Sequence, residues 1–350
     1  MCDHKGDAAF PSAHPWGVPR VIDRFRFRIA GCGTALPRTP LSNVELAKQL
    51  GVETSWIESR CGVETRYKSE GDETTLTLAV EASQMVLQQV PGFVPDMLIC
   101  STFTPEYLLC PTAPAIAHKL ALGPIGAFDL NAACSGAAIG FLTAINFLAT
   151  GFAKRILLVC SDTPTKFLAE GDRNTRILMG DGAAAMALET TDNCQSRLLS
   201  WSIGSDGEGA AYYSVPVGGS ACPQPAQMPP AGELALAVKM EGRQLFKFAV
   251  ARGAELIEHL CEKASVAMES VNWVLIHQAN LRIINALREK VGIPEDRWVV
   301  NVNAVGNTVA ASIPLALADC LDRQAFKEGD IILVVGFGAG LTWAGFLMQW

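Results

Sequence analysis

The chain has 350 residues, of which 49% are hydrophobic and only 18% are charged, so it can bury an extensive interior. This length exceeds one ordinary core and suits two similar halves. The formal net charge of −7 argues against a nucleic-acid partner. We expect no membrane span, because no apolar run reaches the roughly 18 residues that a span needs.

Eleven cysteines are present, with no C-x-x-C pair and no Cys/His spacing typical of a metal site. We therefore expect reduced thiols, no bound metal and a cytoplasmic location. Residues 1–20 agree with this expectation, because they are rich in Pro, His, Asp and Gly and lack the apolar run of a secretory signal.

The first chemical candidate along the chain is Cys134, which lies among small residues just before the apolar stretch 137–149. This pattern predicts a thiol at a helix N-terminus, where unpaired N–H groups favour the thiolate. The small neighbours leave room for a substrate carbonyl. Cys134 is therefore a candidate nucleophile, with a buried, unreactive cysteine as the alternative.

Two parts of the chain repeat one pattern. A buried strand is predicted at 156–160 and is followed by the glycine-containing segment 179–188; the end of the chain repeats this with 331–335 and 336–347. We interpret the repeat as an internal duplication. The β/α alternation predicts an α/β fold with helices on both faces of its sheets. No glycine-rich turn continues as the G-x-G-x-x-G motif of a dinucleotide site.

Two polar residues in the second half each precede a predicted helix. The apolar segment 271–276 predicts a buried strand that ends at His277, and Asn307 follows a glycine before small residues that open a helix. Taken singly, His277 could be a core histidine and Asn307 a helix cap. With Cys134, the three side chains predict one catalytic site.

These motifs resemble the condensing enzymes of the thiolase superfamily and, within them, the type III β-ketoacyl-acyl-carrier-protein synthases. The resemblance rests on the segments around Cys134, His277 and Asn307 and on the terminal segment 336–343, and it covers about residues 25–350. It implies a duplicated five-layer α-β-α-β-α fold with the active site between the halves.

The resemblance also implies three parts of the chain. Residues 1–24 would form an N-terminal extension, 25–190 the half that carries Cys134, and 191–350 the half that carries His277 and Asn307.

The chemistry implied by the resemblance is a decarboxylative condensation without a cofactor. An acyl group from acyl-CoA moves to Cys134, with the backbone N–H groups of Cys134 and Ala339 stabilising the oxyanion. Malonyl-acyl carrier protein then loses carbon dioxide, and His277 and Asn307 donate hydrogen bonds to the enolate that forms.

Further residues acquire roles through the resemblance. Trp56, Arg60 and Arg173 match positions that contact the adenine and phosphates of CoA. Four cations could dock the acidic carrier protein: Lys247, Arg282, Arg288 and Lys290. A half-exposed aromatic and solvated charges remain the alternative interpretation of both groups.

The sequence departs from the family at Cys110 and Ala137, where relatives often have phenylalanine or another aromatic residue. The smaller residues predict a roomier acyl pocket that accepts a medium-chain or branched group. The resemblance implies a homodimer in which the Cys110 loop enters the neighbour's pocket. Glu106 approximately matches a glutamate of head-to-head condensing thiolases, and the stretch 204–232 is interpreted as a surface loop.

Three functions remain open. A decarboxylative condensing enzyme, for fatty-acid initiation or a specialised pathway, is the leading interpretation. The second is an acyltransferase or head-to-head condensing enzyme that makes an ester, amide or signal molecule. The third is an inactive partner subunit, which the intact Cys134, His277 and Asn307 argue against.

Overall fold

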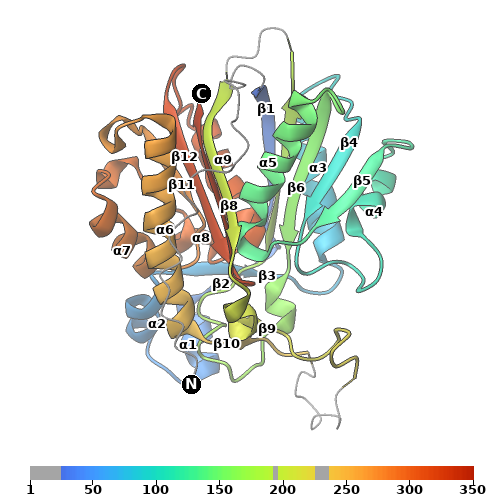
Figure 1. Ribbon diagram of the computed structural model, residues 1–350. Helices are drawn as coiled ribbons and strands as arrows, with labels where there is room; N and C mark the ends of the chain where they lie inside the picture. The colour runs from blue at the N-terminus through green and yellow to red at the C-terminus, as the bar shows by residue number, and fades with distance from the viewer. Residues whose placement is uncertain (1–24, 192–195, 225–235) are drawn as a thin grey trace, which may run out of the picture.

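The computed structural model describes residues 25–191, 196–224 and 236–350 (Figure 1). The predicted extension 1–24 lies outside the described residues, as does the 225–232 part of the predicted surface loop. In the described part, nine strands form one sheet in the order β11-β12-β13-β8-β1-β7-β6-β4-β5.

The first half of the sheet has the order β5-β4-β6-β7-β1. β5, β4 and β6 are parallel neighbours, whereas the β6/β7 and β7/β1 pairs are antiparallel. These strands are β1 (Arg26–Ala35), β4 (Met97–Ser101), β5 (Gly126–Leu130), β6 (Arg155–Asp162) and β7 (Gly182–Glu189).

The second half repeats this order. β11 and β12 are parallel, and the β12/β13 and β13/β8 pairs are antiparallel. On the outer side of β11, Val274 forms a parallel bridge with Trp298, which therefore occupies the position that β5 has in the first half. These strands are β8 (Ser196–Ser205), β11 (Trp273–Ile276), β12 (Ile331–Gly338) and β13 (Thr342–Gln349). The internal duplication expected from the sequence is therefore visible as a repeated strand order.

The two halves meet at β1 and β8, which pair only at Arg26–Arg197 and Phe27–Ser196. The boundary predicted between residues 190 and 191 lies in the connection between β7 and β8. Because β1 and β8 pair at only two positions, the sheets of the two halves can separate and face each other across a layer of helices.

That central layer consists of α5 (Gly136–Ala149) and α9 (Ser312–Asp322), each of which contacts strands of both halves. α3 (Thr75–Gln89) and α4 (Thr112–Lys119) cover the outer face of the first half, and α6 (Gly242–Ala264) and α7 (Leu281–Val291) cover the second (Figure 1). α5 is apolar on most sides because protein surrounds it. The expected α/β fold with five α-β-α-β-α layers is confirmed.

Shorter elements complete the described fold. They are β2 (Thr39–Ser42), α1 (Asn43–Leu50), α2 (Thr54–Cys61), β3 (Thr65–Lys68), β9 (Tyr213–Ser214), β10 (Lys239–Met240), α8 (Val302–Val305) and the 3₁₀ helices η2 (Ala133–Ser135), η3 (Pro164–Phe167), η4 (Gly207–Tyr212), η5 (Met268–Ser270), η6 (Glu295–Arg297) and η7 (Val309–Ala311). Among the described helices, none combines the length and apolar character needed to cross a membrane.

Candidate active site

Cys134 lies in η2, directly before α5 and after the end of β5. The preceding Ala133 has φ of 45°, a left-handed conformation that costs a non-glycine residue about 1–3 kcal/mol. Such strain persists only where the surrounding structure enforces it. The predicted placement of Cys134 at the start of a helix is what the structure shows.

His277 follows β11 and is buried. Its Nδ1 lies 2.7 Å from the Ser312 hydroxyl, which also accepts a 3.4 Å hydrogen bond from the Gln278 N–H. When the Ser312 hydroxyl donates to Nδ1, the neutral ring carries its hydrogen on Nε2. Burial lowers the pKa of His277 to about 3, so the ring is neutral near pH 7.

The contact between Ser312 and His277 was not predicted from the sequence. Ser312 was noted only as a small residue after Asn307, and His277 is 35 positions away from it.

Asn307 is held in one orientation. Its Oδ1 accepts a 2.9 Å hydrogen bond from the Val309 N–H, and its backbone bonds to Leu178 and Gly180. Val309 has φ of 54°, a genuine outlier for a β-branched residue. Because Oδ1 is occupied, the Nδ2 amide group is the free end of Asn307.

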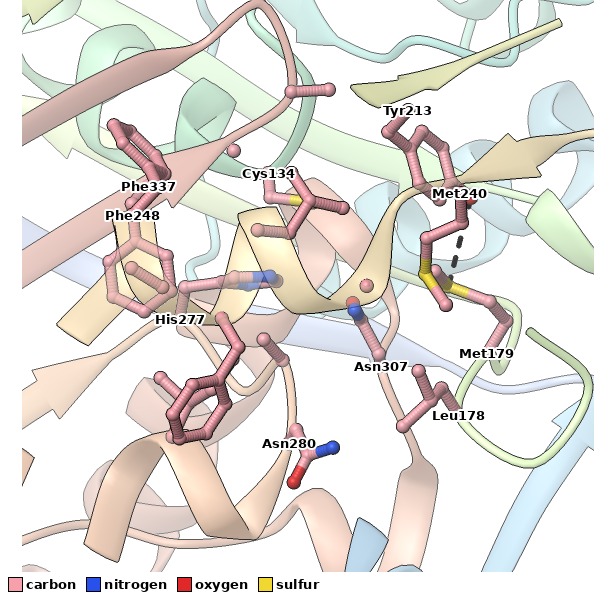
Figure 2. A pocket seen from close by; sticks show the side chains of 18 of the residues that line it. Cys134, Leu178, Met179, Tyr213, Met240, Phe248, His277, Asn280, Asn307 and Phe337 are labelled. Atoms are coloured by element: carbon pink, nitrogen blue, oxygen red, sulfur yellow. Dashed lines mark hydrogen bonds between the residues drawn. The ribbon is translucent and has the colours of Figure 1, made fainter. Parts of the chain in front are cut away.

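One cavity of about 750 Å³ joins these side chains. Cys134, His277 and Asn307 all line it, and Figure 2 shows them side by side around the same space. Cys134 comes from the first half of the fold, whereas His277 and Asn307 come from the second. The fold therefore brings together the three residues that the sequence selected.

The turn after β12 lies directly against the cysteine. A Cβ atom added to Gly338 would lie 2.7 Å from the Cys134 nitrogen and 2.9 Å from its Cβ. Only glycine fits at this position, which leaves the next residue, Ala339, in the wall of the cavity. A backbone N–H at Ala339 is thus in the region where the predicted oxyanion donor is needed.

We expect Gly338→Ala to lower both stability and acyl transfer, because overpacking costs about 1–3 kcal/mol and the neighbouring Cys134 backbone must shift. Thermal unfolding and adduct formation with an acyl-CoA measure the two effects. Gly171→Ala is the matched control, since its added Cβ meets nothing within 4 Å. Equal stability and equal adduct formation in the two variants would contradict the close contact between Gly338 and Cys134.

Burial and a neighbouring charge both act on the Cys134 thiol. Burial raises the pKa of the thiol to about 12, and the nearby charge of Asp162 adds to this rise. The helix N-terminus favours a thiolate, but burial outweighs it in the resting site. Burial therefore favours the neutral form of the Cys134 thiol.

Asp162 is a fully buried carboxylate that the sequence did not single out. One oxygen accepts hydrogen bonds from the Thr102 hydroxyl (3.0 Å), the Phe103 N–H (2.9 Å) and both the N–H (3.1 Å) and hydroxyl (2.9 Å) of Thr104. The other oxygen accepts from the Ala310 N–H at 3.2 Å. Asp162 thereby ties a cavity loop of the first half to η7, which follows Asn307.

We expect Asp162→Asn to shift the pH dependence of Cys134 alkylation to lower pH. The negative charge of Asp162 disfavours the thiolate, so its removal should move the pKa from about 12 toward the ordinary value of 9.0. Iodoacetamide rates at Cys134, followed by peptide mass, report the midpoint. Asp322→Asn is the control, and an unchanged midpoint in Asp162→Asn would oppose the assignment.

The predicted CoA contacts are only partly joined to the cavity. Arg60 lines it, and its guanidinium lies 4.7 Å from the centre of the Trp56 ring. Trp56 itself does not line the cavity. Arg173 is exposed and also outside the lining, although its neighbour Asn174 belongs to it.

The predicted carrier-protein patch is divided by the structure. Lys247 and Arg282 line the cavity, together with Arg243, which the sequence analysis missed. Arg288 instead bonds to Glu295 at 3.0 Å, with only 15% of its side chain exposed, so its inclusion in a free basic patch was wrong. Lys290 is exposed and outside the lining.

Ala137 does not reach the main cavity. It is 2% exposed and lines a separate core cavity of about 20 Å³, because its position on α5 faces the packed interior. Assigning Ala137 to the acyl pocket was therefore wrong for the cavity that contains Cys134.

Two further residues of the sequence analysis lie before α4. Cys110 is exposed and does not line the cavity that contains Cys134. The Glu106 carboxylate accepts a 3.2 Å hydrogen bond from the Leu76 N–H at the start of α3.

A duplicated five-layer fold that presents a cysteine, a histidine and an asparagine to one cavity defines a condensing enzyme of the thiolase type. Two family models match the chain: 3-Oxoacyl-[acyl-carrier-protein (ACP)] synthase III over residues 128–207, and 3-Oxoacyl-[acyl-carrier-protein (ACP)] synthase III C terminal over 261–350. The β-ketoacyl-[acyl-carrier-protein] synthase III of Synechocystis sp. is 38% identical over 326 residues, which cover 92% of this chain and 98% of that protein. The chain belongs to the 3-oxoacyl-acyl-carrier-protein synthase III family and is an acyltransferase.

Solved structures agree with this family assignment. The 3-oxoacyl-(acyl carrier protein) synthase III of Pseudomonas aeruginosa has a TM-score of 0.84 and 34% identity, covering 93% of this chain and 98% of that chain. The priming β-ketosynthase of a polyketide biosynthetic pathway has a TM-score of 0.82 and 30% identity, covering 96% and 98%. The family expected from the sequence is confirmed.

Proposed function

We propose that this enzyme condenses an acyl-CoA primer with malonyl-acyl carrier protein. In the first step the Cys134 sulfur attacks the thioester carbonyl, the acyl group moves to Cys134, and the thiol proton ends on the departing CoA sulfur. The N–H groups of Cys134 and Ala339 stabilise the transient oxyanion. The observation that carries this proposal is the convergence of Cys134, His277 and Asn307 in one cavity.

In the second step the malonyl carboxylate leaves as carbon dioxide, and its electron pair forms an enolate. His277 Nε2–H and Asn307 Nδ2–H donate to the enolate oxygen. The low pKa of His277, about 3, supports this role, because a neutral ring with its hydrogen on Nε2 is a donor across the physiological range. The enolate carbon then attacks the acyl carbonyl, the bond between this carbonyl and the Cys134 sulfur breaks, and a β-ketoacyl thioester is released. The departing Cys134 thiolate takes up one proton from solvent, which restores the thiol.

The cavity also provides a place for the phosphates of the carriers. Arg60, Arg243, Lys247 and Arg282 all line it and are all exposed, so they mark the part that solvent reaches. Phosphate groups occur both in CoA and in the phosphopantetheine arm of a carrier protein. Cationic side chains at this entrance therefore support both as donors of the thioester.

A homodimer in the cytoplasm completes the proposal. Tyr107, Leu108 and Leu109 are 67%, 72% and 100% exposed beside Cys110, and such an apolar run favours burial against a second copy. The nine described cysteines are all free, and most are buried, as suits a reducing compartment.

The test combines each acyl-CoA from acetyl to dodecanoyl with malonyl-acyl carrier protein. We expect one molecule of carbon dioxide for each β-ketoacyl product, both measured by mass spectrometry. An ester or amide without carbon dioxide would replace condensation by simple acyl transfer. A product of two acyl-CoA molecules would indicate head-to-head condensation. A folded dimer that forms no product with any primer would be an inactive partner subunit.

A further inference from the structure

Arg66, on β3, is a fully buried arginine that donates its hydrogen bonds to uncharged oxygens. Its Nη1 donates to the Asn43 side-chain oxygen at 2.7 Å and to the Leu41 carbonyl at 3.4 Å, and its Nη2 donates to the Ile177 carbonyl at 2.9 Å. Burial lowers the pKa of Arg66 to about 10, so the guanidinium is still charged near pH 7. The interior of the protein therefore holds a positive charge at this position.

Such a residue is costly for the fold alone. A buried charge loses its solvation, and apolar side chains of similar size can often replace buried ionic groups without loss of stability. The Nε of Arg66 is also buried and has no hydrogen-bond partner among the described residues. Core packing therefore does not account for an arginine here, and its hydrogen-bond partners indicate what it does.

The bond from Nη2 fixes the first residue of the segment 177–180, which in turn holds Asn307. The Leu178 carbonyl accepts a 2.8 Å hydrogen bond from the Asn307 N–H, and the Gly180 N–H donates to the Asn307 carbonyl at 3.0 Å. Figure 2 shows Leu178 beside Asn307 at the wall of the cavity. Both backbone groups of Asn307 are thus bonded to a segment that Arg66 anchors.

Arg66 also packs directly against the backbone on either side of this contact. A Cβ atom added to Gly180 would lie 3.3 Å from the Arg66 Cβ, and one added to Gly306 would lie 3.0 Å from it. Gly306 has φ of 72° and directly precedes Asn307 in the chain. A change at Arg66 therefore reaches Asn307 through two neighbouring backbone segments.

We propose that Arg66 is a positioning residue for Asn307, which donates to the enolate oxygen in the proposed condensation. This inference rests on that proposed function. Arg66 does not line the cavity, so it acts through the segment 177–180 and not on the substrate. Orientation of the donor matters, because a misplacement of about 1 Å can lower a rate by about 10²-fold. Acylation of Cys134 does not use Asn307, so the effect should be confined to decarboxylation and condensation.

The test measures the two half-reactions separately in Arg66→Met, which keeps a long side chain and removes the guanidinium. We expect carbon dioxide release from malonyl-acyl carrier protein to fall at least about tenfold. Rapid-quench acylation of Cys134 by acetyl-CoA should stay near the wild-type rate. Arg197→Met is the matched control, because Arg197 also lies on a strand and bonds to uncharged Gln349 at 3.0 Å, but is outside the lining of the cavity.

Arg66→Lys keeps the charge and one donor group, so it should recover part of the lost decarboxylation. If Arg66→Met does not fold, Arg66→Lys should show the same selective loss at smaller size. A third variant combines Arg66→Met with Asn307→Asp. Its decarboxylation should be little slower than that of Asn307→Asp alone, because two changes that act through one group are not additive.

Three results would overturn the inference while the condensing function stands. They are unchanged decarboxylation in the folded Arg66 variants, an equal fall of acylation and decarboxylation, and the same loss from Arg66→Met with or without Asn307→Asp. Either of the last two would mean that Arg66 supports the fold in general. Absence of carbon dioxide release by the wild type would instead refute the proposed function on which the inference rests.

Discussion

Replacing Cys134 by alanine should abolish the acyl adduct and lower the condensation rate by about 10⁴-fold or more, because no other group can carry the acyl intermediate. Intact mass after incubation with acyl-CoA measures the adduct, and product formation with malonyl-acyl carrier protein measures the rate. Decarboxylation of malonyl thioester should persist in the variant, since it uses His277 and Asn307 rather than the thiol. This separation distinguishes a lost nucleophile from a collapsed site.

Cys222→Ala is the control for this experiment, because Cys222 is half-buried and lies outside the lining of the cavity. It should form the wild-type adduct at the wild-type rate. A Cys134→Ala protein that still becomes acylated at one site would move the nucleophile to another of the remaining cysteines. Loss of both acylation and decarboxylation would instead point to misfolding, which thermal unfolding would reveal.

Asn307→Asp should lower the condensation rate by about 10² to 10³-fold, the effect of removing one oxyanion-hole donor. The substitution keeps the size of the side chain and the oxygen that accepts from the Val309 N–H at 2.9 Å. It replaces the donating amide by an oxygen and adds negative charge where the enolate forms. The loss should therefore fall mainly on decarboxylation and condensation, and less on acylation of Cys134.

Rapid-quench measurement of the two half-reactions separates these effects. Asn285→Asp makes the same chemical change on the exposed face of α7 and should behave as wild type. If Asn307→Asp slowed acylation as strongly as condensation, Asn307 would act in positioning the first substrate, and the enolate role would have to be abandoned.

The proposed catalytic residues could be selected from the sequence because each has a local signature. Cys134 lies among small residues before an apolar helix, His277 ends a predicted strand, and Asn307 follows a glycine. These signals depend on neighbours within a few positions, which is the range over which backbone conformation is determined. The repeated apolar strands likewise predicted the duplicated α/β fold.

The residues that tune the site were not readable, because their partners are distant in sequence. Ser312 acts on His277 35 positions earlier, and Asp162 bonds to Ala310 148 positions later. Nothing near either residue marks it as special. Only the folded structure shows which buried polar groups form hydrogen bonds with each other.

The two errors have related causes. Ala137 was assigned to the acyl pocket because it follows Cys134, but its side chain faces the core because of how α5 is rotated between the two halves. Arg288 was counted as a free cation, but the turn after α7 brings Glu295 within 3.0 Å of it. Both outcomes depend on helix orientation and loop path, which local sequence does not specify.

The sequence by itself therefore determined the class of fold, the family and the three groups proposed to carry the chemistry. Tertiary structure decided the rest: that burial raises the pKa of Cys134, and that burial lowers the pKa of His277. Desolvation and cavity shape arise from the packing of many distant residues at once. Chemical identity is encoded at single positions, whereas the environment that tunes it is a property of the packed chain.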